Sequence, residues 1–145
     1  MNEEQLASIA NDMRIDIVRM IAEAGSGHPG GSLSCADILS VLYFDTMKHD
    51  PSNPKNEDRD RFILAKGHAA PALYAALAES GYFPKEELAT LRKLGTRLQG
   101  HPDMNLLPGI EVSTGSLGQG LSVACGMALS GKLTSDTYKV YTILG

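Results

Sequence analysis

Cysteine, tryptophan and long apolar runs are scarce or missing in this chain of 145 residues, which has two cysteines and no tryptophan. Cys35 and Cys125 form no CxxC pair, so they indicate neither a zinc site nor a disulfide scaffold. We expect both to be small core residues of a reduced, cytoplasmic protein. No apolar run approaches the ~20 residues of a membrane span. The opening MNEE lacks the basic and apolar regions of a secretory signal.

An excess of positive charge is also missing, because the formal net charge is −4 and the isoelectric point is about 5.5. Such a chain has no general attraction to polyanions, so we expect neither nucleic acid nor a membrane as a partner. Hydrophobic residues make up 43% and charged residues 21%, which argues against disorder. The length fits one domain with its own core.

Helical and strand patterns alternate along the chain. Apolar residues at helical spacing predict helices, and short apolar runs predict strands. Their alternation predicts an α/β fold with a parallel sheet. The predicted helices cover 4–24, 34–47, 69–79, 85–94 and 117–133, the strands 61–64 and 138–144, and a long loop 95–115.

Two strands are too few for a parallel sheet, which is normally several strands wide and covered on both faces. We therefore expect residues 1–145 to be the opening part of a larger α/β domain, an incomplete one as it stands.

Three of the four histidines directly follow a glycine in a turn: His28 in GSGHPGG, His68 in AKGHAAP and His101 in QGHPD. A single turn histidine is more often structural, bonded to a nearby carbonyl. Three such turns in one short chain favour a site instead, and His68 follows a predicted strand, where loops converge in parallel sheets. The fourth, His49, lies at a predicted helix end, where a cation is favourable. The glycines and proline of GSGHPGG predict a turn without helix.

A second glycine cluster, STGSLGQG at 113–120, opens the predicted helix 117–133. Free backbone N–H groups at a helix start suit an anion or a polar heterocycle. The spacing is not GxGxxG, so a dinucleotide site is not indicated. GMALSGKL at 126–133 lies late in a helix and is no phosphate loop, so Met127, Leu129 and Leu133 are expected in the core.

Together these segments resemble transketolase, and more narrowly the amino-terminal subunit of the split, two-gene form. The resemblance implies an α/β domain of the thiamine diphosphate-binding PP type, with an incomplete parallel sheet and helices on both faces. It also implies transfer of a two-carbon ketol unit between sugar phosphates with thiamine diphosphate and Mg²⁺ (or Ca²⁺). The matching segments are SGHPGGSLSCADILSVLYF, HDPSNPKNEDRDRFILAKGHAAPALYA, LQGHPD, PGIEVSTGSLGQGLSVACGMA and VYTILG.

The resemblance also implies roles for the histidines. It implies that His28 and His101 are catalytic residues. His28 would contact substrate hydroxyls and assist proton transfer, and His101 would reach the donor substrate. His68 becomes a hydrogen-bond partner of the cofactor diphosphate.

For the glycine loop, the resemblance implies that the backbone of Gly115, Ser116 and Leu117 holds the aminopyrimidine side of the cofactor. In the family the strand ending ILG continues into a GDG motif that holds the metal, so the metal ligands are expected beyond Gly145. A carboxy-terminal subunit or further domains are expected as partners, in a homo- or hetero-oligomer.

We expect the isolated chain to be inactive. Two alternatives stay open: another thiamine diphosphate enzyme, such as a deoxyxylulose-phosphate synthase, or a non-catalytic assembly partner.

Overall fold

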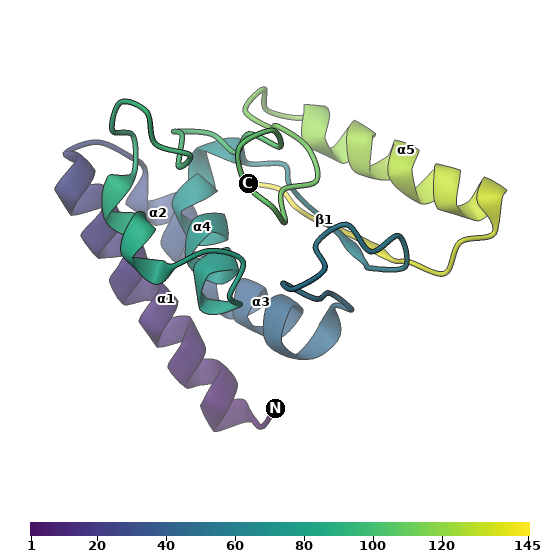
Figure 1. Ribbon diagram of the computed structural model, residues 1–145, viewed down its shortest axis with the longest axis horizontal. Helices are drawn as coiled ribbons and strands as arrows, with labels where there is room; N and C mark the ends of the chain where they lie inside the picture. Colours follow the sequence, from purple (N-terminus) through teal and green to yellow (C-terminus); the bar gives the residue numbers. More distant parts are fainter.

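A computed structural model describes all residues 1–145 and shows a group of helices beside a short sheet and one outlying helix (Figure 1). The α-helices are α1 (Glu3–Ala24), α2 (Pro29–Leu33), α3 (Ala36–Val41), α4 (Ala70–Glu79) and α5 (Gln119–Thr134). A π-helical turn η1 (Leu42–Thr46) and two 3₁₀ segments, η2 (Gly67–Ala69) and η3 (Lys85–Thr90), complete the helical part. The strands are β1 (Arg61–Leu64) and β2 (Val140–Ile143).

The long helix α1 has local signals at both ends. Asn2 accepts a hydrogen bond from the backbone N–H of Gln5, whose side chain bonds back to Asn2, forming a capping box. Gly25 ends the helix in the left-handed conformation. Between these caps, Met13 and Ile17 face the core and are fully buried.

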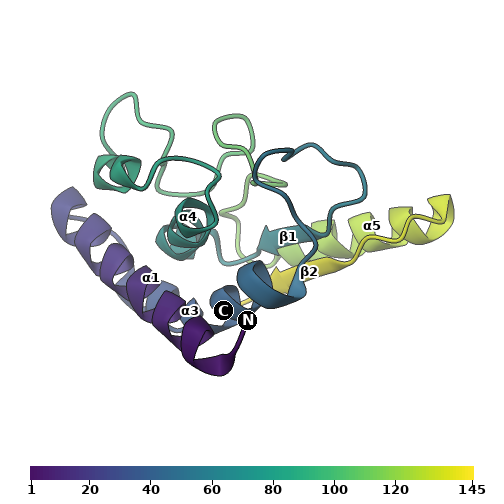
Figure 2. The same ribbon diagram turned by 60° about the horizontal axis from the view of Figure 1, so that its bottom comes forward.

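The sheet is parallel, with Arg61 of β1 opposite Val140 of β2. Phe62 and Leu64 pack into the core formed by the helices. On the other face lies α5, so close that a β-carbon on Gly120 would be 2.6 Å from the Cα of Ala65 (Figure 2). The predicted α/β class and the helices on both faces of an incomplete sheet are therefore confirmed.

The core is centred on α4, whose residues from Ala70 to Ala78 are all buried. Five of its ten side chains are alanine, and small side chains let neighbouring elements approach closely. The fully buried Tyr74 turns its hydroxyl to the long loop and donates to the carbonyls of Gln99 (2.8 Å) and His101 (3.2 Å). Leu98 of that loop is fully buried too, so the loop is anchored in the core.

The glycine-rich stretch after α1 differs from its prediction, because its second half forms α2. Proline is favourable at the first helical position, where its missing N–H leaves no bond unmade. Ser32 donates to the carbonyl of His28 (3.3 Å), which closes this turn. Cys35, with φ −113° and ψ 7°, then separates α2 from α3. The predicted helix 34–47 therefore begins at Ala36, as α3, and continues directly into the π-helical turn η1, which ends at Thr46.

The predicted helix 85–94 is shorter and of a different type, since only Lys85–Thr90 is helical and the type is 3₁₀. The hydroxyl of Thr90 bonds to the carbonyl of Glu87 (2.7 Å) and to Thr96 (2.6 Å), and Leu91 leaves the helical conformation with a ψ of 126°. These local bonds compete with a longer helix. The other predicted elements exist, with ends that differ by a few residues.

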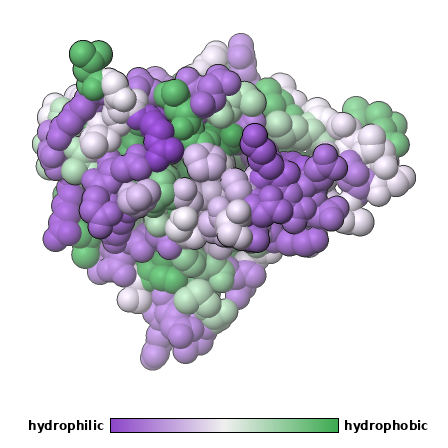
Figure 3. All heavy atoms as spheres, viewed as in Figure 1, coloured by the Kyte–Doolittle hydropathy of each residue, from purple (hydrophilic) through white to green (hydrophobic).

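The outer face of α5 is exposed, which corrects four predictions. Cys125 is exposed, Leu129 and Leu133 are 58% and 79% exposed, and Met127 is only half-buried. In this chain α5 packs against the two strands and nothing else covers its far side. Apolar spacing marks a side chain that can be buried, but a neighbouring element must be present to bury it. Figure 3 shows apolar residues at the surface in this region. No helix is both long and apolar enough for a membrane crossing.

Candidate functional site

His28 and His68 come from separate turns and lie side by side. His28 is the residue before α2 and is exposed, whereas His68 lies in η2 just beyond β1 and is half-buried. Their rings meet edge to face, with centroids 5.6 Å apart. Gly31 of α2 makes this approach possible, because a β-carbon there would be 3.2 Å from Nε2 of His68.

The turn of His68 also touches the glycine loop 113–118. A β-carbon on Gly67 would be 2.7 Å from the backbone nitrogen of Gly115 and from the carbonyl of Thr114. Only glycine fits between these backbone groups. The loop that precedes α5 is therefore held directly against the carboxyl end of β1.

His101 lies on the other side of that loop. Its side chain is exposed, and its Cδ2 would be 3.2 Å from a β-carbon on Gly115. The Tyr74 hydroxyl holds the carbonyl of His101 from the core side. Burial raises the pKa of Tyr74 above its ordinary range, so this phenol stays a hydrogen-bond donor. The predicted turns of His28, His68 and His101 are thus linked through one chain of contacts.

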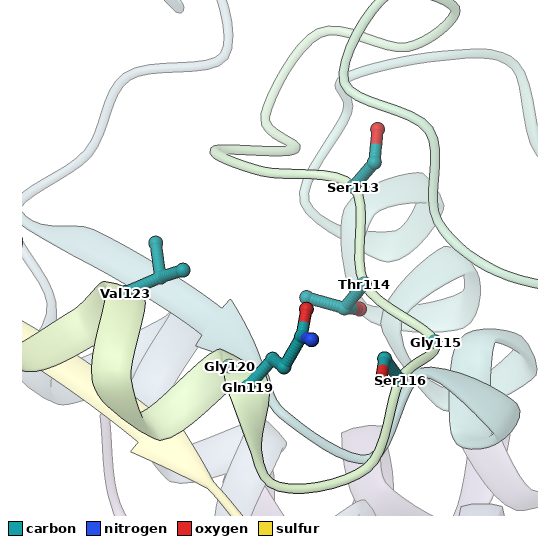
Figure 4. Close-up of a pocket in the computed structure, with 7 residues that line it drawn as sticks. All are labelled: Ser113, Thr114, Gly115, Ser116, Gln119, Gly120 and Val123. Atoms are coloured by element: carbon teal, nitrogen blue, oxygen red, sulfur yellow. The ribbon is translucent and has the colours of Figure 1, made fainter.

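A pocket of about 290 Å³ opens between the loop and the start of α5 (Figure 4). Thr114 is one of its lining residues, and its hydroxyl Oγ1 is buried without a hydrogen-bond partner. The side chain of Gln119 points toward Thr114 in Figure 4. The helix begins without a side-chain cap, so the N–H groups of its first turn have no side-chain acceptor. The pocket is lined by Ser113, Thr114, Gly115, Ser116, Gln119, Gly120 and Val123.

Two of the three residues predicted for the cofactor loop line this pocket. Gly115 and Ser116 do so, whereas Leu117 lies beside it with a 66% exposed side chain. These donors fit a ligand with polar and anionic parts, because the first turn of a helix and a free hydroxyl can both bond to it. No group of three or more histidine, cysteine or acidic side chains with metal-binding geometry is present.

Arg92 belongs to the site region and has no signal in the sequence. Its backbone is left-handed (φ 60°), which is unusual for a residue with a side chain. Its guanidinium donates to Ser26 (3.3 Å), two residues before His28. The same group packs on Gly100, where a β-carbon would be 3.1 Å from Nε, directly before His101. Arg92 therefore contacts both the turn of His28, at Ser26, and the turn of His101, at Gly100.

Two other polar clusters lie outside the site. Glu111 pairs with Arg59 (2.7 Å) near the start of β1, the end opposite the histidines. Burial raises the pKa of Glu111, although Arg59 and the nearby Arg61 oppose the shift.

His49 is not the free cation at a helix end that its position predicts. Its Nδ1 lies 3.0 Å from the Tyr82 hydroxyl and its Nε2 lies 2.6 Å from the Tyr43 carbonyl. Both ring nitrogens have partners, so His49 has a structural role.

The site combines glycine–histidine turns at the carboxyl end of a parallel strand with a helix that starts at a glycine loop. This arrangement is typical of a cofactor-binding α/β domain. Residues 5–143 match the family described as "Transketolase, thiamine diphosphate binding domain". The chain belongs to this family and corresponds to the amino-terminal portion of transketolases, as its sequence motifs predict.

Curated relatives include whole enzymes and separate subunits. The chain is 48% identical over 143 residues to the transketolase of Pongo abelii, covering 98% of this chain and 23% of the relative. It is 50% identical over 147 residues to the 6-deoxy-6-sulfo-D-fructose transketolase subunit SqwG of Clostridium sp. (strain MSTE9), covering 100% of this chain and 54% of that subunit. The chain therefore spans about a quarter of one kind of relative and about half of the other.

Solved transketolases show the same arrangement of elements. The structure from Campylobacter jejuni superposes with a TM-score of 0.94 at 40% identity, covering 100% of this chain and 24% of that one. A transketolase from Pichia stipitis, solved in complex with sedoheptulose 7-phosphate, gives 0.92 at 35% identity over 95% and 22% of the two chains. The similarity covers the whole short sheet and its helices.

Proposed function

We propose that this chain supplies the thiamine diphosphate-binding part of a transketolase-type transferase. The reaction moves a two-carbon ketol unit from a ketose phosphate to an aldose phosphate, once further domains complete the site. The observation that supports this most is the meeting of three glycine–histidine turns with the pocket loop at the end of β1. Relatives named as transketolases and transketolase subunits support the same reaction class.

Some residues of the chain would bind the cofactor, and others would bind the substrate. His68 would bond to the diphosphate, and the backbone of Gly115, Ser116 and Leu117 would hold the aminopyrimidine side. When bound, thiamine diphosphate supplies the nucleophilic carbon of the reaction.

His28 and His101 are the proposed catalytic residues because both are exposed, His28 beside His68 and His101 beside Gly115 of the pocket loop. An imidazole can donate to a sugar hydroxyl or accept its proton near neutral pH. His28 would bond substrate hydroxyls and move protons, and His101 would orient the donor sugar. The backbone around each ring is fixed, which favours a defined reaction geometry.

The metal, Mg²⁺ or Ca²⁺, needs oxygen ligands that these 145 residues do not bring together. We place those ligands in sequence beyond Gly145. A carboxy-terminal subunit or the remaining domains would supply the rest of the site, in a homo- or hetero-oligomer. The subunit relatives named above support such a division. The proposal includes a cytoplasmic location and an inactive isolated chain.

The test measures cofactor binding and ketol transfer separately. Isothermal titration with thiamine diphosphate and Mg²⁺ is done on the chain alone and together with its carboxy-terminal partner or domains. We expect ketol transfer only in the complete assembly, and its loss in His28→Ala and His101→Ala variants. Lys132→Ala is the control, because it removes an exposed charged side chain on α5, outside the site. An absence of binding heat under both conditions would refute the cofactor role and favour a non-catalytic assembly partner.

A substrate assay distinguishes ketol transfer from a different thiamine diphosphate reaction. Pyruvate with glyceraldehyde 3-phosphate releases CO₂ in a deoxyxylulose-phosphate synthase, whereas ketol transfer between two sugar phosphates releases none. CO₂ release by the complete assembly would contradict the transketolase assignment.

A further inference from the structure

Arg92 has a backbone conformation that this chain otherwise gives almost only to glycine. Its φ is 60°, and the other residues with a positive φ are six glycines and Ser135. Ser135 ends α5, and helices commonly end in a left-handed residue. A residue with a β-carbon is less favourable than glycine in this conformation. Its presence at position 92 therefore points to a role of the side chain itself.

The core fixes the backbone from which this side chain extends. The N–H of Arg92 donates to the carbonyl of Leu98 (2.9 Å), which closes residues 92–98 into a loop. Leu91 and Leu98 are 1% and 0% exposed, so both ends of the loop are anchored in the core. Arg92 itself is exposed. Its guanidinium is therefore held at the surface by a backbone that is fixed from below.

The guanidinium contacts both segments that carry a proposed catalytic histidine. Nη1 donates to Ser26 (3.3 Å), two residues before His28. The rest of the group packs on Gly100, directly before His101, where a β-carbon would be 3.1 Å from Nε and 3.2 Å from Nη2. A guanidinium is planar and has donors on several sides, so one such group can hold two segments at a fixed separation.

The neighbouring residue joins the same parts of the chain. Lys93 pairs with Glu23 near the end of α1 (2.8 Å), in the segment that leads to Ser26. Both side chains of this pair are about half exposed, so the pair adds little stability by itself. Arg92 takes part in no ion pair. Its attachment to the two turns is therefore by hydrogen bonding and packing.

We propose that Arg92 is a positioning residue, which fixes the turns of His28 and His101 relative to each other so that both imidazoles act on one sugar substrate. The inference rests on the proposed function, in which these two histidines act together. Arg92 contacts the chain just before each histidine, so it acts through the turns. A displacement of about 1 Å in a reacting group can lower a rate by roughly 100-fold.

The variant Arg92→Gly separates the side chain from the backbone. Glycine adopts the left-handed conformation readily, so the variant keeps the loop and loses the guanidinium. Ser135→Gly is the matched control, because it makes the same exchange at the other left-handed residue, at the exposed end of α5. Both variants should unfold close to the wild-type temperature, since relief of backbone strain is opposed by the greater freedom of glycine in the unfolded chain. An unfolding temperature of Arg92→Gly far below that of Ser135→Gly would overturn the inference and show a structural residue.

The kinetic test uses the complete assembly with a ketose phosphate donor and an aldose phosphate acceptor. We expect Arg92→Gly to lower kcat by roughly 10- to 100-fold and to change KM for the donor by less than about threefold. Ser135→Gly should have the kinetics of the wild type. An unchanged kcat in Arg92→Gly would overturn the inference. If KM rises in that case, Arg92 binds the substrate itself.

NMR of the histidine rings in the 145-residue chain tests the positioning without any reaction. Arg92→Gly should shift the ring signals of His28 and His101 and leave that of His49, whose two partners lie elsewhere. Ring signals of His28 and His101 at their wild-type positions would refute the positioning role and leave the proposed function intact. A wild-type assembly without ketol transfer would refute the proposed function, while a shift of both rings would still support the link through Arg92.

Discussion

Two glycines of the same helix should respond to the same substitution with opposite signs. At Gly126, in the middle of α5, a new β-carbon would meet nothing within 4 Å. Gly126→Ala should therefore stabilise the protein by about 1 kcal/mol, the difference in helix propensity between the two residues. At Gly120, in the first turn, the same methyl group would be 2.6 Å from the Cα and 2.7 Å from the Cβ of Ala65.

The clash at Gly120 cannot be relieved by a side-chain rotation, because it involves the backbone of Ala65, directly after β1. The helix must move away by roughly 1 Å before the contact becomes ordinary, and such overpacking costs about 1–3 kcal/mol. The propensity gain is common to both variants and smaller in the first turn, so the clash sets the difference between them. We expect Gly120→Ala to be less stable than Gly126→Ala by about 2 kcal/mol or more.

Urea unfolding followed by circular dichroism measures this difference directly. With a slope of about 2 kcal/mol per molar urea, the two midpoints should be separated by roughly 1 M. Equal midpoints, or a higher midpoint for Gly120→Ala, would refute the close packing of α5 against β1. Gly120 also lines the pocket, next to the loop 113–118, so Gly120→Ala should weaken the binding of any ligand there. Gly126→Ala should leave that binding unchanged.

Three further predictions concern stability and the histidine turns. Burial raises the pKa of Glu111 in the folded state, so its stabilising contribution is full below the unfolded-state pKa and is lost as pH rises through the folded-state pKa. The free energy of unfolding of Glu111→Gln, measured by urea titration, should therefore rise relative to that of the wild type between pH 4 and pH 7. Tyr74→Phe should lower the free energy of unfolding by about 1–2 kcal/mol and speed amide exchange around His101; unchanged exchange there would contradict the anchoring role. Arg92→Ala should shift the NMR signals of both the His28 and His101 rings, and a shift of only one would disprove the link between the turns.

Local patterns predicted the parts of the fold that are determined locally. The helix up to Gly25, the strand at Arg61–Leu64 and the three glycine–histidine turns each have their signal within a few residues. Their meeting at one end of the sheet follows from the general rule that loops after parallel strands converge. The sequence therefore predicted that these turns converge, and the structure shows how they touch.

Features that depend on distant neighbours were not predictable. Leu133 has the spacing of a core residue, yet nothing in this chain covers it. The link made by Arg92 joins residues 66 positions apart and has no periodic signature. The buried state of Lys66 and the unpartnered hydroxyl of Thr114 likewise appear only when several segments are packed together.

The pairing of β1 with β2 has a consequence for synthesis of the protein. The paired residues are 79 positions apart, so a ribosome adding 5–20 residues per second needs about 4 to 16 s to make the partner of a finished β1. During that time α1, α3 and α4 can already pack together, since all their residues precede β2. We expect pulse-labelled amides of α4 to be protected before those of β1 in refolding, and simultaneous protection would disprove this order. The end of the sheet that bears His68 and Lys66 is then assembled last, so a nascent chain acquires its helical core before it acquires its site.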